Sequence, residues 1–204
     1  MTMKRWQCVL LMCAAVLCGG RTSWAQSSPA TGGAAAAPAK AAPTARASLD
    51  NTIYLDLKYG RVVIQLHPEL APKTVARFKQ LVGQHFYDGL KFHRVIDGFM
   101  AQTGDPKGDG TGGSGQNIVA EFNAGLHVRG AVSMARAADV NSADSQFFIV
   151  TADSQFLDGK YTYFGEVTSG MEFVDKIRKG DQAQNGAVAM PDQIIRMRLA
   201  GAKK

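Results

Sequence analysis

Cysteine is scarce in this 204-residue sequence and is confined to its start. It occurs at Cys8, Cys13 and Cys18 and nowhere later. Beyond residue 18 the chain therefore cannot build a disulfide scaffold or use a thiolate as a nucleophile. The four histidines show no close pair, so we expect no metal site, and the sequence predicts no cofactor.

Long hydrophobic runs are also missing after residue 20, which excludes a protein with several membrane spans. Acidic residues are missing from the first 48 positions, where five of the 23 basic residues lie. The chain from Leu49 onward therefore carries 18 basic and 17 acidic residues and is close to neutral. Net charge gives no support to a nucleic-acid partner, and we expect none.

Residues 1–25 have the pattern of a secretory signal peptide. Lys4 and Arg5 supply a charged start, and an apolar stretch from Trp6 to Leu17 follows. Small residues at Ser23 and Ala25 suit a signal peptidase, so we predict cleavage after Ala25 and loss of all three cysteines with the leader. We therefore expect an exported protein of a bacterial periplasm, with no stable membrane association after cleavage.

Two alternatives exist for this leader. The first is an uncleaved membrane anchor, although the apolar stretch is short for a stable span. The second is a lipoprotein, but bulky Met12 and Leu17 precede Cys13 and Cys18, where lipid attachment requires a small residue.

Residues 26–48 consist largely of Ala, Pro, Ser, Thr and Gly, with no apolar side chain larger than alanine. Such a segment cannot bury a core, and its prolines interrupt every alanine run. We predict a disordered linker at 26–48 and a single folded domain at 49–204.

The domain begins with strand-like alternation. Ile53, Leu55 and Leu57 share one face, a turn follows at Tyr59-Gly60, and Val62 starts a return strand. Pro72 suits the first turn of a helix that Gly83 would end. A second helix is expected over 171–178, and six more short strands at 91–96, 99–103, 131–134, 146–151, 163–167 and 194–199. The sequence predicts a mainly β fold, a closed eight-stranded antiparallel barrel capped by two α-helices.

Several motifs suggest chemistry that their context does not support. Residues 108–113 fit G-x-G-x-x-G, but they lie in a glycine-rich loop rather than between a strand and a helix. The same loop lacks the carboxylate that a calcium loop needs at its twelfth position, where Gln116 stands. There is no G-x-S-x-G elbow, and Ser133 with His93 stays open as a nucleophile–base pair that chance alone could produce.

Residues 92–105 and 145–149 carry the most unusual pattern. They place Arg94, Gln102 and Gln146 among Phe, Met, Val and Ile on strands expected to be neighbours. One interpretation is a barrel wall whose arginine extends to solvent. The other is an apolar pocket with a polar rim, suited to a small apolar group attached to a peptide backbone.

The chain resembles the cyclophilin family of peptidyl-prolyl isomerases over roughly residues 49–199. The resemblance rests on ordered motifs: Phe-His-Arg-Val-Ile at 92–96 with Gly-Phe-Met at 98–100, Ser-Met-Ala at 133–135, Ser-Gln-Phe-Phe-Ile at 145–149, and Phe-Leu-Asp-Gly-Lys at 156–160. It implies a cyclophilin-like domain with the substrate groove on the outer face of the barrel. Implied partners are proline-containing peptides and unfolded exported proteins.

The resemblance also implies roles for individual residues. Arg94 would be the catalytic arginine, with Gln102 binding the substrate backbone and Phe99 in the proline pocket. The other implied substrate-binding residues are Met100, Phe148 and Leu157 in that pocket, Ala135 and Gln146 along the groove, and His93, Ile96, Phe156 and Tyr161 around it.

Three positions depart from the pattern of many members: Phe156 stands for Trp, Tyr161 for His, and Arg136 for Asn. We expect none of them to touch the catalytic arginine or the proline pocket, so isomerase activity should persist. Binding of cyclosporin, which in the family relies on that tryptophan, should be possible but weak. The rival hypothesis is a chaperone that holds proline segments without turnover.

Overall fold

The computed structural model describes residues 49–202, and every statement about structure below concerns that part of the chain. The signal peptide predicted at 1–25 and the linker predicted at 26–48 lie outside the described residues. No helix within the described residues is both long and apolar enough to cross a membrane.

The predicted hairpin is confirmed in β1 (Thr52–Leu57) and β2 (Gly60–Leu66). Ile53 pairs with Ile64 and Leu55 with Val62, and all four side chains are fully buried. The alternation in the sequence therefore marks the face that packs into the core. The turn requires glycine at Gly60, since an added Cβ there would lie 2.6 Å from the Phe173 ring.

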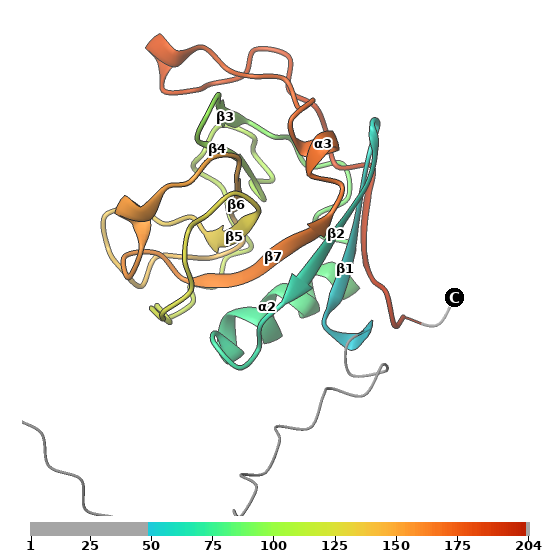
Figure 1. Ribbon diagram of the computed structural model, residues 1–204, viewed down its shortest axis with the longest axis vertical. Helices are drawn as coiled ribbons and strands as arrows, with labels where there is room; N and C mark the ends of the chain where they lie inside the picture. Colours follow the sequence, from blue (N-terminus) through green and yellow to red (C-terminus); the bar gives the residue numbers. More distant parts are fainter. Residues whose placement is uncertain (1–48, 203–204) are drawn as a thin grey trace, which may run out of the picture. The chain divides into compact units, whose positions relative to one another are not determined.

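Six further strands complete a single antiparallel sheet (Figure 1). They are β3 (Arg94–Ile96), β4 (Met100–Thr103), β5 (Ala131–Met134), β6 (Phe147–Val150), β7 (Tyr163–Ser169) and β8 (Arg196–Leu199). The order is β3-β4-β6-β5-β7-β2-β1-β8, so the strand number is as predicted. The predicted closed barrel is not what the structure has: the sheet is open and curled, with β3 and β8 at its edges. An isolated bridge between Lys91 and Gln193 joins the segments that precede these edges, with no continuous ladder between the strands.

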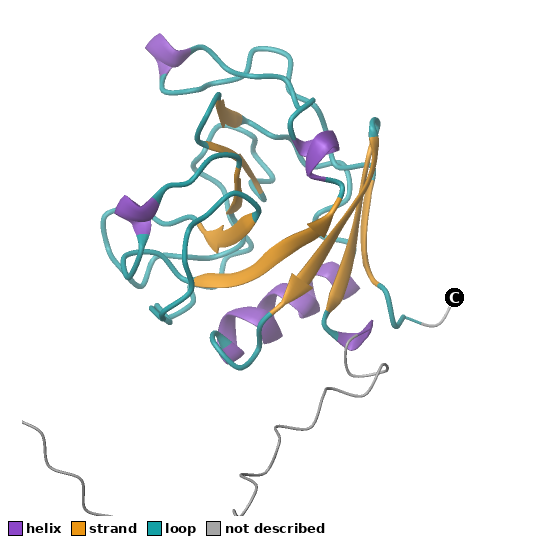
Figure 2. Cartoon of the chain, in the orientation of Figure 1, coloured by secondary structure: helices purple, strands orange, loops and turns teal. Residues whose placement is uncertain are grey.

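Two α-helices lie at opposite ends of β2 (Figure 2). α2 (Pro72–Gly83) has the predicted bounds and buries Val75 and Phe78. α3 (Met171–Val174) is shorter than the 171–178 expected. Beyond the end of α3 the hydrogen bonds are no longer α-helical: Ile177 donates to the Val174 oxygen three residues earlier, and the backbone N–H of Arg178 donates to the Asp192 carboxylate at 2.9 Å. Two 3₁₀ turns, η1 (Gln155–Leu157) and η2 (Gln182–Gln184), lie in connecting loops.

Strand β6 divides the apolar side chains between two clusters. Phe147 and Ile149 point into the main core beneath the sheet, where Phe147 packs edge-on against Phe78 at 5.2 Å between ring centroids. Phe148 and Val150 point to the other face and form a smaller cluster with Met100, Leu157 and Tyr163. The continuous apolar run of β6 therefore contributes side chains to both faces of the sheet, because successive side chains of a strand point in opposite directions. The smaller cluster supports the site described next.

Candidate functional site

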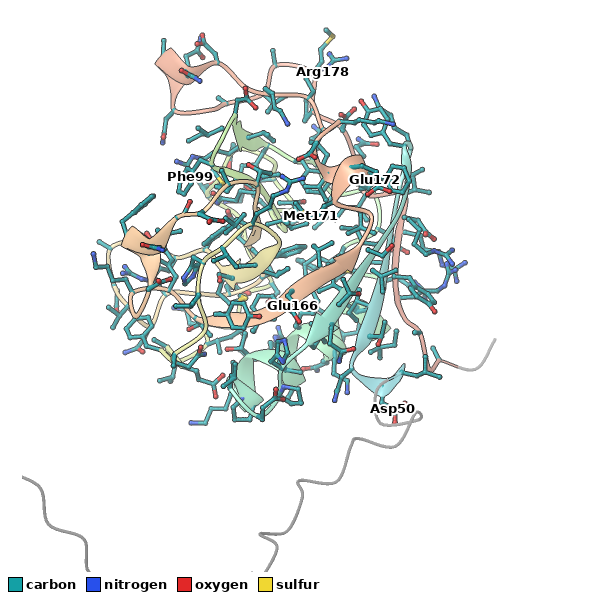
Figure 3. The ribbon with its side chains drawn as sticks, viewed as in Figure 1. Asp50, Phe99, Glu166, Met171, Glu172 and Arg178 are labelled. Atoms are coloured by element: carbon teal, nitrogen blue, oxygen red, sulfur yellow. The ribbon has the colours of Figure 1, made fainter. Side chains whose placement is uncertain are left out.

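A cavity of about 280 Å³ opens on the face of the sheet that carries the smaller cluster. It is lined by Arg94, Phe99, Met100, Gln102, Ala135, Arg136, Phe148, Phe156, Leu157 and Tyr161. Figure 3 labels Phe99 beside β3 and β4, on the side of the sheet away from α2. Met100, Phe148 and Leu157 are each at most 5% exposed, so the cavity has a firm apolar floor.

The strand register brings the key side chains together. Arg94 on β3 pairs with Gln102 on β4, Gln102 pairs with Phe148 on β6, and Phe148 pairs with Ser133 on β5. Residues directly opposite one another in a sheet share a face. One row across four strands therefore holds a cation, an amide and an aromatic ring in fixed sequence.

A directed chain of hydrogen bonds fixes the polar side of the cavity. Arg94 donates from Nη1 to Gln102 Oε1 at 3.1 Å, and Gln102 donates from Nε2 to Gln146 Oε1 at 2.9 Å. Gln146 in turn donates to the carbonyl oxygens of Gly110 and Gly112 at 3.0 and 2.8 Å. Each amide accepts on one side and donates on the other, which sets the orientation of both amide groups.

Asn185 also holds the Arg94 guanidinium, a contact that the sequence did not predict. Its backbone oxygen accepts from Arg94 Nε and its Oδ1 from Arg94 Nη2, both at 2.9 Å. Asn185 has a left-handed backbone with φ 54°, which asparagine tolerates better than most residues. The Asn-Gly pair at 185–186 indicates a turn, but nothing local shows that this turn meets an arginine 91 residues earlier.

Three hydrogen bonds orient the Arg94 guanidinium, and two of its N–H groups remain available as donors. Of its five N–H bonds, one at Nε, one at Nη1 and one at Nη2 have these partners, which leaves two for a bound molecule. The side chain is half-buried at the cavity rim, and burial lowers the pKa of Arg94 below the usual value for arginine. It stays charged at physiological pH, since arginine starts far above that range.

Three predicted site residues do not line this cavity. His93 borders a neighbouring cavity of about 570 Å³, where both of its ring nitrogens are buried without a hydrogen-bond partner, and burial lowers the pKa of its imidazole. Gln146 borders a second neighbouring cavity of about 330 Å³. Ile96 packs against the smaller cluster from outside the cavity. These three residues surround the cavity and do not form its wall.

The expectation that Phe156, Tyr161 and Arg136 stay clear of the pocket is wrong. All three line the same cavity as Arg94. Phe156 is 62% exposed, and its ring centroid lies 5.4 Å from that of Phe99. The strand pattern could not place them because they lie in loops, whose path depends on contacts with distant parts of the chain.

The glycine-rich loop surrounds the carboxylate of Asp105, and its Gly110 borders both neighbouring cavities. Asp105 accepts the backbone N–H groups of Lys107, Asp109 and Gly110 at 2.8, 3.0 and 2.5 Å. Burial alone would raise the pKa of Asp105, but these hydrogen bonds outweigh it and hold the pKa below the usual 3.8. Across residues 49–202, no group of three histidine, aspartate, glutamate or cysteine side chains is placed to hold a metal ion.

Ser133 pairs with His127 and not with His93. The Ser133 hydroxyl lies 2.9 Å from His127 Nε2, and His127 Nδ1 lies 2.9 Å from Asp158 Oδ1. This is the arrangement of a hydrolytic triad, but Ser133 and His127 are both fully buried. No substrate carbonyl can reach the hydroxyl. The network instead ties the loop that carries Leu157 to strand β5.

Comparison with known proteins identifies a family. The model of the family "Cyclophilin type peptidyl-prolyl cis-trans isomerase/CLD" matches residues 52–199. A "Probable peptidyl-prolyl cis-trans isomerase" of Brucella suis is 51% identical over 170 residues, which cover 78% of this chain and 87% of that protein. The "Peptidyl-prolyl cis-trans isomerase B" of Bacillus subtilis is 49% identical over 133 residues, covering 64% of this chain and 92% of that one.

Solved structures give the same result. A Cryptosporidium parvum cyclophilin-type isomerase, crystallised in the presence of the dipeptide Ala-Pro, has a TM-score of 0.67 and 28% sequence identity. The match covers 72% of this chain and 98% of that one. A cyclophilin from Hirschia baltica has a TM-score of 0.66 and 27% identity, covering 74% of each chain.

The carboxylate of Asp105 predicts an acid-dependent contribution to stability. Because its pKa in the folded protein lies below 3.8, its ionised form stabilises the fold above that value, and the contribution is lost as pH falls through the folded-state pKa. Asp105→Asn should lower the urea midpoint at pH 7, and the difference from the wild type should shrink at pH values below about 3.8. The control is Asp97→Asn, at an exposed aspartate. An Asp105→Asn deficit that stays constant with pH would contradict this account.

Proposed function

Because this chain belongs to the cyclophilin-type peptidyl-prolyl cis-trans isomerases, a family of enzymes, we propose that it accelerates rotation about X-Pro bonds with Arg94 as the catalytic residue. The observation that carries the proposal is the position of the Arg94 guanidinium. It is held at the rim of an apolar cavity by three hydrogen bonds and keeps two N–H bonds for a substrate.

The reaction needs stabilisation of a twisted amide. Resonance gives the C–N bond partial double-bond character, and rotation crosses a barrier of about 18–20 kcal/mol. In the twisted state that resonance is lost and an electron pair localises on the prolyl nitrogen. A guanidinium aimed at this nitrogen binds the twisted state more strongly than either planar state, and such differential binding is what lowers a barrier.

The cavity suits a prolyl ring. Phe99, Met100, Phe148 and Leu157 offer apolar contact on its floor and wall, which would hold the ring while the bond before it rotates. Gln102, oriented by its bonds to Arg94 and Gln146, would bind the substrate backbone. The Ala-Pro dipeptide named for the Cryptosporidium relative is a ligand of this chemical class.

Replacement of Arg94 tests the mechanism. Arg94→Ala should lower kcat/KM for a proline peptide by about 100-fold, the usual cost of removing a group that stabilises developing charge. Arg94→Lys should also lose activity, because one ammonium cannot hold both Gln102 and Asn185 as the guanidinium does. Exposed Arg196 supplies the matched control, Arg196→Ala. Equal turnover by the wild type and Arg94→Ala would contradict the mechanism. If the wild type binds proline peptides without turnover, the result would favour a chaperone that holds proline segments.

Asn185→Gly tests how much the hydrogen bond from Arg94 to the Asn185 side chain contributes to activity. Glycine tolerates the left-handed backbone at this position but removes the Oδ1 that accepts from Arg94. Loss of one hydrogen bond of about 0.5–1.5 kcal/mol should reduce kcat/KM about two- to tenfold. We expect this loss with no shift in the urea midpoint beyond that of a surface substitution.

We further propose that the protein acts in a bacterial periplasm on unfolded exported proteins. The support is the leader predicted at residues 1–25 and the absence of cysteine after it. Uncatalysed X-Pro isomerisation takes roughly 10–100 s, slow enough to limit the folding of such proteins.

Cell fractionation tests this location. The protein should be found in the periplasmic fraction with Gln26 as its first residue, while Ala25→Trp should impair cleavage because the peptidase requires a small residue there. Recovery of the protein from the cytosol with residues 1–25 intact would contradict the proposed location.

For cyclosporin we propose weak binding, limited by Phe156. The phenyl ring is smaller than an indole and has no N–H donor. Phe156→Trp should strengthen cyclosporin binding by up to about tenfold, and Phe156→Leu should weaken it, as measured by calorimetric titration. An unchanged affinity in Phe156→Trp would show that this position does not limit binding.

A further inference from the structure

Arg136 lies where the three cavities of the groove meet. It lines the central cavity of about 280 Å³ and both neighbouring cavities, of about 330 and 570 Å³. Of the other lining residues, Gln102 alone is also common to all three. A peptide that leaves the central cavity in either direction therefore passes Arg136.

The positive charge of Arg136 has only neutral partners among the described residues. Its guanidinium donates to the backbone oxygens of Lys160, Ala137 and Ala138 and lies 4.9 Å from the centroid of the Tyr161 ring. These contacts orient the group without neutralising it, since neither a carbonyl nor a ring carries a full charge.

The charged residues around the central cavity are Arg94 and Arg136, and both are cationic. Each neighbouring cavity contains one carboxylate, and both carboxylates keep their charge because their hydrogen-bond donors are neutral. Asp144 accepts the backbone N–H groups of Ser114 and Gly115, and Asp109 accepts the N–H and hydroxyl of Thr111. The central cavity, by contrast, is lined by two cations and by no acidic residue.

We infer that Arg136 determines specificity by favouring an acidic residue directly before the proline over a basic one. This inference rests on the proposed isomerase function. The carbonyl carbon of the preceding residue is bonded to the prolyl nitrogen that Arg94 faces, so this residue begins at the cationic rim. A glutamate there gains attraction to Arg136, whereas a lysine meets repulsion.

The experiment compares three peptides that differ only in the residue before proline, which is Glu, Ala or Lys. For a partly exposed charge pair we expect the wild type to have a Glu-to-Lys ratio of kcat/KM of about fivefold. Arg136→Gln should lower that ratio at least about twofold, and Arg136→Lys, which keeps the charge, should retain it. Arg196→Gln makes the same change in net charge away from the groove and should leave the ratio unchanged.

The outcomes separate this inference from the proposed function. If the wild type accelerates none of the three peptides, the isomerase proposal fails. If it accelerates all three with equal kcat/KM, or if Arg136→Gln and Arg196→Gln change the ratio equally, the role of Arg136 is wrong and the isomerase proposal stands. Should Arg136→Gln fail to fold, Arg136→Asn makes the same change in charge and should lower the Glu-to-Lys ratio in the same way.

Discussion

Neutral groups from three separate segments hold Arg94, and the rest of the site is arranged around them. Gln102 comes from the adjacent strand, Asn185 from the η2 loop, and Gln146, behind Gln102, from the residue just before β6. The η2 loop is itself anchored to β3, since Val95 donates to the Gly186 oxygen at 2.8 Å and Gly180 donates to the Val95 oxygen at 2.9 Å. The groups that orient the guanidinium are therefore themselves anchored to the edge of the sheet.

The apolar half of the site depends on the alternation of β6. Because Phe147 belongs to the main core and Phe148 to the outer cluster, the core that stabilises the sheet also fixes the ring that floors the cavity. Beneath Phe148 the fully buried His127 links Ser133 to Asp158, next to Leu157. One buried polar network thus joins the strand beside Phe148 to the loop that carries Leu157.

Much of this arrangement was predictable, and the failures have physical causes. The resemblance to the cyclophilin family indicated Arg94, Gln102 and Phe148, and the strand register explains why these three residues lie in one row. Asn185 was not accessible in that way, since a loop contact across 91 residues leaves no periodic signal. The closed barrel failed for a related reason: a strand count does not determine whether β3 and β8 form a ladder, and here one isolated bridge between the preceding segments takes its place.

The choice of neutral acceptors also suits the proposed chemistry. A carboxylate beside Arg94 would orient the guanidinium equally well, but it would cancel the charge that the twisted amide requires. Amide and carbonyl oxygens fix direction through hydrogen bonds and leave the net charge intact. Without an ionic partner, burial destabilises the charged guanidinium, and this lowers the pKa of Arg94. Arginine can bear that cost because its pKa starts far above neutrality, and a lysine in the same place would begin much closer to losing its proton.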